Sequence, residues 1–285
     1  MVEIVRRLAD LRSAVGGWRR QGLVSAVVPT MGALHDGHIS LVQAALARAD
    51  RVVVTIFVNP KQFNAATDLV NYPRAEASDI AKLETCGAHL LYLPAIEEIY
   101  PPGFATTVSV TGISEGLCGA FRPGHFDGVA TVVAKLLLQT GAELAFFGEK
   151  DFQQVKVIER MVRDLDIPVE IVACPTVREA DGLALSSRNL RLGAAEREQA
   201  PRLAAILFAT ADRLQAGAAV AATLEAASAE IIAAGFRTVE YLELRAESDL
   251  RPLDTLERPA RLLVAAWLGE TRLIDNVAVV RRGGD

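Results

Sequence analysis

The sequence has few cysteines, and their spacing forms no pattern. Only three occur in 285 residues, at Cys86, Cys118 and Cys174. An odd number at wide spacing argues against a disulfide framework and indicates a reducing compartment. We expect all three to be buried, because unpaired cysteine behaves as a small apolar side chain.

Long apolar runs and an excess of basic charge are also lacking. The N-terminal region carries Glu3, Arg6, Arg7 and Asp10, so we predict neither a signal peptide nor a transmembrane span. The 30 Lys and Arg residues are outnumbered by 35 Asp and Glu residues, which gives a net charge of −5. Since general nucleic-acid binding needs a basic footprint, we expect no nucleic acid as partner. Because no span is predicted, we expect no membrane as partner either. A local cationic pocket is still compatible with this balance.

The stretch from Pro29 to His38, Pro-Thr-Met-Gly-Ala-Leu-His-Asp-Gly-His, carries the strongest functional signal. It follows an apolar run and precedes an amphipathic one. This predicts a buried strand, a glycine-bearing turn and a helix start, and a start near Asp36 would bring the two histidines of the stretch together. The first turn of a helix has unpaired N–H groups and a positive dipole end, so it suits phosphate. His35 and His38 are three residues apart and would lie together at that end.

Two other interpretations of this histidine pair compete. The pair could be half of a zinc site, although a third and a fourth ligand are hard to find in the sequence. The two side chains could also be ordinary polar residues at a helix start. The chain has only four histidines and two of them fall in this one turn, so we favour a phosphate site.

The first 175 residues alternate between strand and helix patterns. Strands are expected at 23–28, 51–58, 90–93, 144–147 and 169–173, with a further one at 106–110. Helices are expected at 3–21, 38–49, 73–86, 126–140 and 151–165. This alternation predicts an α/β fold with a doubly wound parallel sheet, whose ligands lie at the C-terminal ends of the strands.

After residue 175 the pattern changes. Two alanine-rich helices are expected at 194–216 and 219–234, and three apolar strands at 238–245, 261–268 and 272–280. Gly269-Glu270 fits a tight hairpin between the last two strands. We therefore predict two domains, 1–175 and 176–285, the second a smaller C-terminal α+β domain with a short antiparallel sheet. The final residues, 281–285, are expected to be frayed.

Polar residues follow several of the predicted strands. Asn59 and Gln62 come after the run 51–58, where a capped turn would explain them equally well. Arg122 lies in the glycine-bearing segment 119–128. Its planar fork can hold a carboxylate, and a plain surface loop is the competing interpretation.

Two further stretches offer donors and charges. Residues 148–154, Gly-Glu-Lys-Asp-Phe-Gln-Gln, provide a turn for phosphate, the cation of Lys150 and the carboxylate of Asp151, which can hold Mg²⁺ through water. Ser186, Ser187 and Arg188 form a compact set of donors near the predicted domain junction, where ligand sites and lids are common. A serine nucleophile is the rival explanation, but neither a Gly-x-Ser-x-Gly elbow nor a base is evident.

Six stretches, in order, resemble the pantoate–β-alanine ligase (pantothenate synthetase) family of the nucleotidylyl-transferase superfamily. They are PTMGALHDGH (29–38), FVNPKQF (57–63), DLVNYPR (68–74), RPGHFDGV (122–129), FFGEKDFQQ (146–154) and PTVREADGLALSSRN (175–189). Two departures are visible, Leu185 where the family often has Met and Thr67 where an acidic residue is common. The last hundred residues resemble the family only in length and pattern.

The resemblance implies a cytoplasmic homodimer with a Rossmann-like N-terminal domain. It also implies that ATP contacts Met31, Gly32, Ala33, Leu34, His35, Asp36, Gly37, His38, Gly148, Glu149, Lys150, Asp151, Val177, Leu185, Ser186, Ser187 and Arg188. Pantoate would contact Asn59, Gln62, Arg122 and Gln154, and Gln62 would also lie near β-alanine. His38, His35 and Lys150 would be the catalytic residues, with Mg²⁺ near Asp151.

The implied reaction joins (R)-pantoate to β-alanine with ATP, through a pantoyl adenylate, and releases pyrophosphate and AMP. A carboxylate is already ionised at neutral pH, so the first step is limited by charge repulsion rather than by a base. The second step needs a neutral amine, for which no base is evident. Another adenylyl-transferring enzyme, which would lack the Asn59, Gln62, Arg122 and Gln154 set, is one rival. A non-catalytic nucleotide-binding regulator is the other.

Overall fold

The computed structural model describes residues 1–64, 69–70 and 72–281. The chain divides into two compact units, which are treated separately below. Unit 1 comprises Met1–Glu149 and Val157–Pro175, and unit 2 comprises Lys150–Lys156 and Thr176–Asp285. The chain thus changes unit after Pro175, and the short segment Lys150–Lys156 groups with unit 2. Thr67, parts of the stretch 68–74 and the tail 282–285 lie outside the described residues.

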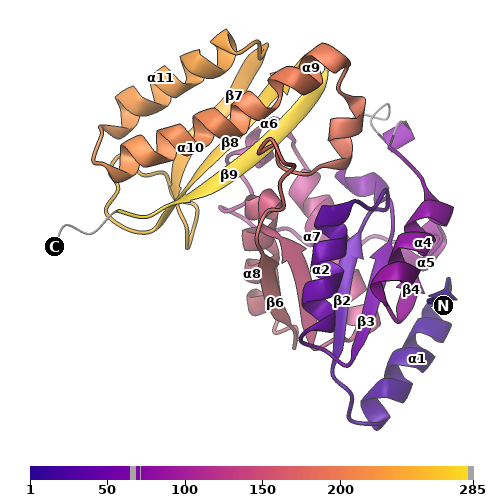
Figure 1. The fold of residues 1–285 in the computed structure, drawn as a ribbon. Helices are drawn as coiled ribbons and strands as arrows, with labels where there is room; N and C mark the ends of the chain where they lie inside the picture. The colour runs from indigo at the N-terminus through magenta and orange to yellow at the C-terminus, as the bar shows by residue number, and fades with distance from the viewer. Residues whose placement is uncertain (65–68, 71, 282–285) are drawn as a thin grey trace. The chain divides into compact units, whose positions relative to one another are not determined.

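Unit 1 is built on a six-stranded parallel sheet (Figure 1). In spatial order its strands are β1 (Glu3–Val5), β4 (Leu90–Tyr92), β3 (Arg51–Ile56), β2 (Ser25–Thr30), β5 (Leu144–Gly148) and β6 (Glu170–Cys174). The apolar centres of β2 and β3 are fully buried, as expected for strands covered on both faces. The predicted doubly wound parallel sheet is confirmed.

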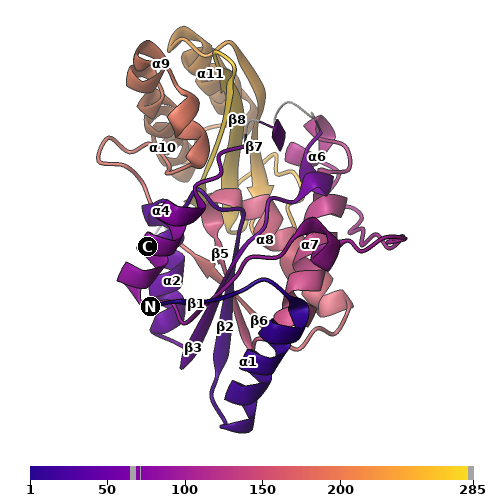
Figure 2. The same cartoon turned by 90° about the vertical axis from the view of Figure 1, so that its right-hand side faces the viewer.

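Helices cover both faces of this sheet. Figure 2 shows α2 (Asp36–Leu46) and α4 (Glu76–Cys86) on one face, and α1 (Leu8–Arg20) and α7 (His125–Thr140) on the other. The shorter elements are α5 (Ile96–Ile99), α6 (Cys118–Phe121) and the 3₁₀ turns η1 (Pro60–Gln62) and η2 (Glu149–Asp151). Helix α8 (Phe152–Asp164) begins in unit 2 and continues in unit 1.

Unit 2 is a small α+β unit. Its antiparallel sheet has the order β7 (Thr238–Ala246), β8 (Ala260–Leu268) and β9 (Thr271–Val279). Helices α10 (Pro201–Gln215) and α11 (Val220–Ala233) pack on this sheet, and α9 (Ala194–Gln199) and η3 (Ser187–Arg191) precede them (Figure 1). Gly269, with a left-handed φ of 53°, lies in the connection between β8 and β9. The predicted antiparallel sheet and the hairpin at Gly269-Glu270 are confirmed.

The structure corrects two predictions for unit 1. The expected helix 3–21 begins only at Leu8, because residues 3–5 form β1 and pair with β4. The strand expected at 106–110 is absent from the described residues. That segment runs along α7 instead, where the Thr131 hydroxyl accepts from the N–H of Val108 at 3.0 Å and Asp127 accepts from the hydroxyl of Ser109 at 2.7 Å.

Two smaller corrections concern a proline and a cysteine. The single helix expected at 194–216 is two helices, α9 and α10. Pro201 lacks an N–H group, so it cannot continue α9 and stands at the first position of α10 instead. Cys118 and Cys174 are buried as predicted, whereas Cys86, the last residue of α4, is only half-buried.

None of the helices in the part of the chain that the structure describes combines the length and apolar character needed to cross a bilayer.

Candidate active site

The strand order of unit 1 reverses between β2 and β5. From β2 the chain proceeds outward through β3 and β4 and then returns to β5, on the other side of β2. In open α/β sheets, ligands bind beyond the C-terminal ends of the strands at this point. The segment Met31–His38 follows β2 there, and β5 ends at Gly148 and is followed by Glu149. The two predicted phosphate-binding turns therefore begin at the two strands that flank the reversal.

The turn after β2 is held in an unusual backbone conformation. Gly32 and Ala33 both have left-handed φ angles, of 86° and 51°. A side chain on Gly32 would bring its Cβ to 3.0 Å from Ile56 Cγ2 and 3.2 Å from Asp79 Oδ2, so only glycine fits there without strain. The Thr30 hydroxyl donates to the carbonyl of Thr55 at 2.8 Å and accepts from the N–H of Gly32 at 3.2 Å. Bonds on both sides thus fix the exit of β2.

The two histidines of this turn lie together, as predicted. Helix α2 begins at Asp36, and His35 is its N-cap. The N–H of His35 donates to Nδ1 of His38 at 3.3 Å, and the two ring centroids are 4.0 Å apart. Because an accepting Nδ1 carries no proton, the neutral ring of His38 carries its proton on Nε2. His38 therefore offers an N–H donor at the positive end of α2.

Asn59 is fully occupied by protein partners. It is 1% exposed and caps η1. Its Nδ2 donates to Gln62 Oε1 and to the carbonyl of Gly128, both at 3.0 Å. Its Oδ1 accepts from the hydroxyl of Tyr100 at 2.7 Å and from the N–H of Lys61 at 3.3 Å. Burial raises the pKa of Tyr100 well above its usual value, so this hydroxyl stays a donor.

Gln62 is the centre of a second set of contacts. Its Nε2 lies 2.9 Å from Sδ of Met31. Its backbone carbonyl accepts from Nη2 of Arg122 at 3.2 Å and from Nδ1 of His125 at 2.8 Å. Arg122 also approaches Nε2 of His125 at 3.1 Å. Since arginine can only donate, this Nε2 accepts, and the proton of His125 is on Nδ1.

A glycine lets η1 approach α7 closely. A Cβ on Gly128 would lie 2.4 Å from the carbonyl oxygen of Lys61. The structure thus brings Asn59, Gln62 and Arg122 together in unit 1, three of the four residues that the family resemblance groups. Whether these side chains contact pantoate stays a prediction.

The predicted site residues Lys150, Asp151 and Gln154 lie in the segment Lys150–Lys156. Nζ of Lys150 lies 3.8 Å from Oδ2 of Asp151, and the two side chains are 16% and 47% exposed. The carbonyl of Lys150 accepts from Nδ2 of Asn276, on β9, at 3.0 Å. Gln154, the third residue of α8, is half-buried. The charge pair of Lys150 and Asp151 is therefore anchored to the sheet of unit 2 by its backbone.

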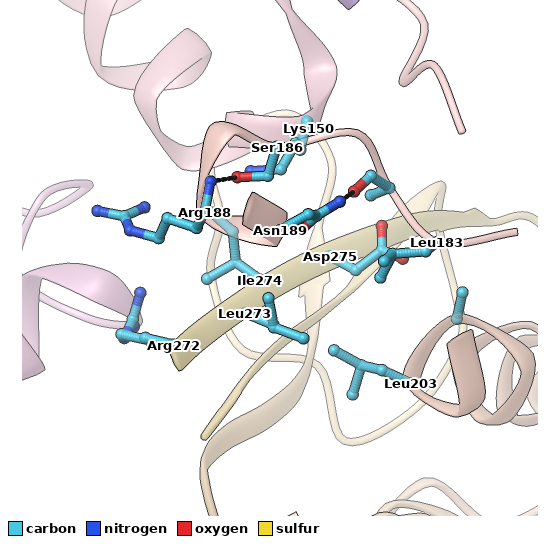
Figure 3. Close-up of a pocket in the computed structure, with 12 residues that line it drawn as sticks. Lys150, Leu183, Ser186, Arg188, Asn189, Leu203, Arg272, Leu273, Ile274 and Asp275 are labelled. Atoms are coloured by element: carbon cyan, nitrogen blue, oxygen red, sulfur yellow. Dashed lines mark hydrogen bonds between the residues drawn. The ribbon is translucent and has the colours of Figure 1, made fainter. Parts of the chain in front are cut away.

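Residues 177–189 form a folded loop in unit 2. The N–H of Leu185 donates to the carbonyl of Val177 at 3.0 Å. Both ends of the Arg178 fork donate to the buried Asp275, at 2.7 and 2.8 Å. Ser186 caps η3, where its hydroxyl accepts from the N–H of Arg188 at 3.2 Å (Figure 3).

Figure 3 shows a small pocket of unit 2, with a volume of about 10 Å³, that Lys150, Ser186 and Arg188 line together. The predicted cation and the two predicted donors, more than thirty positions apart in the sequence, thus share one pocket.

Unit 1 contains a larger cavity, of about 510 Å³. It opens beyond the C-terminal ends of β2, β3 and β4. Met31 and Gly32 of the turn line it, together with apolar residues such as Phe57 and Leu93, and Arg74 stands at its wall. The turn after β2 is therefore adjacent to a space large enough for a small organic molecule.

Side chains that could ligate a metal are scattered across the part of the chain that the structure describes. Over residues 1–64, 69–70 and 72–281, no group of three or more His, Cys, Asp or Glu side chains is placed to hold a metal ion. The half-exposed carboxylate of Asp151 suits Mg²⁺ that arrives with phosphate oxygens, because Mg²⁺ is commonly held by one or two carboxylates and a substrate phosphate.

Comparison with known proteins agrees with this geometry. The family model for pantoate-beta-alanine ligase matches residues 3–278. The chain belongs to the pantoate–β-alanine ligase family. Pantothenate synthetase of Chelativorans sp. (strain BNC1) is 68% identical over 280 residues, which cover 98% of this chain and 99% of that protein. Pantothenate synthetase of Ruegeria pomeroyi is 60% identical, over 97% of each chain.

Solved structures of the family have the same fold. The pantothenate synthetase of Thermus thermophilus superimposes with a TM-score of 0.91 at 44% identity and covers 98% of this chain and 100% of its own. The pantoate-beta-alanine ligase of Francisella tularensis, described as a complex with beta-gamma ATP and beta-alanine, superimposes with a TM-score of 0.84 at 35% identity. That match covers 100% of this chain and 99% of the other.

Three residues that shape the site are missing from the sequence predictions. Tyr100 holds Asn59, His125 holds the carbonyl of Gln62, and Asp79 contacts the turn after β2. Each lies more than forty positions from its partner. His125 lies inside a matched stretch, which is the one signal that could have singled it out.

Proposed function

We propose that this protein is an ATP-dependent ligase that condenses pantoate with β-alanine to give pantothenate, AMP and pyrophosphate. Membership of the family and the turn after β2, with its histidine pair at the start of α2, carry the proposal. In the first step the pantoate carboxylate attacks the α-phosphorus of ATP and pyrophosphate leaves. In the second the amine of β-alanine attacks the acyl carbon, AMP leaves, and the amine loses its proton to solvent or phosphate.

The first step must overcome repulsion between two anions. At about 4 Å and an effective dielectric of about 20, each unit repulsion is worth about 4 kcal/mol. We assign the compensating donors and cations to Met31–His38, Gly148–Asp151, Val177 and Leu185–Arg188. The Nε2 proton of His38 supplies a donor to a phosphate oxygen, and Lys150 supplies a cation, because such groups stabilise the charge that develops in the transition state.

Mg²⁺, when bound with ATP, neutralises phosphate charge, and we propose Asp151 as the protein carboxylate that faces it. The distance of 3.8 Å between Nζ of Lys150 and Oδ2 of Asp151 is long for a strong ion pair, so their mutual contact does not prevent either group from binding a ligand. Gln62, Arg122 and Gln154 are proposed to hold pantoate, with Gln62 also near β-alanine. Asn59 keeps Gln62 in place in this proposal, and contacts pantoate only if it gives up a protein partner.

Two properties taken from the family resemblance complete the proposal, a homodimer and a cytoplasmic location. Sedimentation of the purified protein and fractionation of cells would test them separately from the chemistry.

A product assay tests the reaction. The protein, incubated with ATP, MgCl₂, pantoate and β-alanine, should form AMP and pantothenate in equal amounts, and omission of any one substrate should abolish pantothenate formation. His38→Asn should lower turnover by about 10²-fold, as expected for loss of one transition-state donor. His89→Asn, a histidine outside the site, is the matched control and should keep wild-type turnover at pH 8. Production of AMP without pantothenate would exclude this ligase activity.

A further inference from the structure

Two side chains of helix α4 bind backbone groups of the turn after β2. Asp79, on α4, is 1% exposed. Its Oδ2 accepts from the N–H of Ala33 at 2.8 Å, and its Oδ1 accepts from the N–H of Leu34 at 2.8 Å. Lys82, three residues further along the same helix, donates from Nζ to the carbonyl of Leu34. Three polar contacts thus join one face of α4 to two residues of the turn.

The turn needs such a restraint. Ala33 has a left-handed φ of 51°, a conformation that is unfavourable for a residue with a side chain. The adjoining Gly32 is also left-handed, with a φ of 86°. Without an acceptor, the N–H groups of Ala33 and Leu34 would have no partner in a partly buried loop, which is unfavourable. The two oxygens of Asp79 satisfy both N–H groups and select this conformation over others.

The two hydrogen bonds that Asp79 accepts explain why a carboxylate lies at this buried position. A buried carboxylate is costly unless several hydrogen bonds compensate it, and an anion close to a phosphate site also repels the ligand. A neutral side chain could fill the same space. A carboxylate is the one side chain of this size that accepts two parallel N–H groups at once. The pair of hydrogen bonds from the turn to its two oxygens is therefore the feature that explains a carboxylate at position 79.

We propose that Asp79 is a positioning residue that holds the turn Met31–His35 in its nucleotide-binding shape, so that His35 caps α2 and His38 meets the phosphates. This inference rests on the proposed function for the identity of the ligand. Asp79 contacts no substrate in this proposal and acts only through the backbone of Ala33 and Leu34. Lys82 reinforces the same grip from the surface.

Asp79→Asn tests the assignment, with Glu84→Gln as the matched control. The asparagine amide keeps the shape but offers one acceptor oxygen, and its NH₂ group opposes the second N–H. Glu84 lies on the same helix, is exposed, and undergoes the same change of charge and group. The dissociation constant of a non-hydrolysable ATP analogue and the amide exchange rates of Ala33 and Leu34 are measured for both variants. The KM values for ATP and for β-alanine are measured in the full reaction.

In Asp79→Asn we expect the analogue to bind about 10-fold more weakly or worse, since loss of a buried hydrogen-bond partner has an effect of this order. KM for ATP should rise in parallel while KM for β-alanine is unchanged, and Ala33 and Leu34 should exchange faster. A general loss of folded protein would lower the apparent kcat without raising KM for ATP. Unchanged analogue binding, or unchanged exchange at Ala33 and Leu34, would overturn the proposal.

Should Asp79→Asn not fold, Lys82→Met, at an exposed position, gives the deciding measurement. It should weaken analogue binding in the same direction by a smaller factor, and an unchanged affinity would overturn the proposal. If the wild-type protein makes no pantothenate, the proposed function fails. The analogue affinity and the amide exchange of the variants would still decide whether Asp79 positions the turn.

Discussion

Hydrogen-bond capacity separates two neighbouring amides that the sequence treats alike. Asn59 uses both amide hydrogens and both acceptor positions on protein partners. Gln62 accepts one bond from Asn59 and directs one hydrogen at the weakly accepting sulfur of Met31. Gln62 therefore keeps capacity for a ligand, whereas Asn59 is better suited to hold Gln62 in place.

Gln62→Ala should therefore weaken the binding of pantoate about 10-fold or more and leave the binding of ATP nearly unchanged. The reason is that an amide that holds a substrate hydroxyl contributes about 1–3 kcal/mol to binding. Gln154→Ala should act in the same direction. Gln43→Ala, at an exposed position on α2, is the control and should change neither affinity. Calorimetric titrations with pantoate and with the ATP analogue measure both. Weaker ATP binding with unaffected pantoate would show that these amides are assigned to the wrong substrate.

At the scale of helices and strands, the sequence predicts those elements whose structure is determined by neighbouring residues. The turn after β2 is predictable because an apolar strand, a glycine and a helix start are contiguous, and α2 does begin at Asp36. Strand β1 is not predictable in this way, because a strand of three residues is defined by its pairing with β4, far along the chain. The segment 106–110 alternates like a strand, but its polar groups pair with α7 instead. Asp79 reads as an ordinary helix residue until its contact with Ala33 is seen.

One short junction joins three strands of the sheet. The N–H of Val52, on β3, donates to Nδ1 of His89 at 3.1 Å, and the N–H of His89 donates back to the carbonyl of Val52 at 3.2 Å. The carbonyl of His89 accepts from the N–H of Glu3, on β1, at 3.1 Å. His89 itself immediately precedes β4. Burial, and to a smaller extent the charge of Arg51, lowers the pKa of His89 below its ordinary value of 6.5.

This junction should make stability depend on pH. Because the folded pKa is the lower one, the unfolded chain binds more protons in the window below 6.5. The stabilisation is thus fully present above 6.5 and is lost as the pH falls toward the folded pKa. Urea unfolding from about pH 8 to about pH 5 should show this loss in the wild type and a flatter profile in His89→Asn. Identical pH profiles for the two proteins would mean that protonation of His89 does not weaken the sheet.

At the scale of the whole molecule, the proposed function requires a chain with net negative charge to bind anionic substrates. The net charge of −5 gives no general attraction for ATP or pantoate, so binding depends on local cations and on oriented N–H groups. Under the proposed function, the candidate groups are the histidine pair, in unit 1, and Lys150 and Arg188, in unit 2. Sequence patterns predict most elements of each unit, but the assignment of both units to one reaction rests on the family.

The reaction has an order that can be tested on the intact protein. The proposed site has groups to neutralise phosphate but no evident base for an amine, so adenylation should proceed without β-alanine. Enzyme mixed with ATP, Mg²⁺ and pantoate alone should release close to one pyrophosphate per active site and then stall, the kinetic sign of an accumulating intermediate. Addition of β-alanine should then discharge pantothenate and AMP. Enzyme that completes the full reaction but gives no such burst would exclude the two-step mechanism and leave the substrates as assigned.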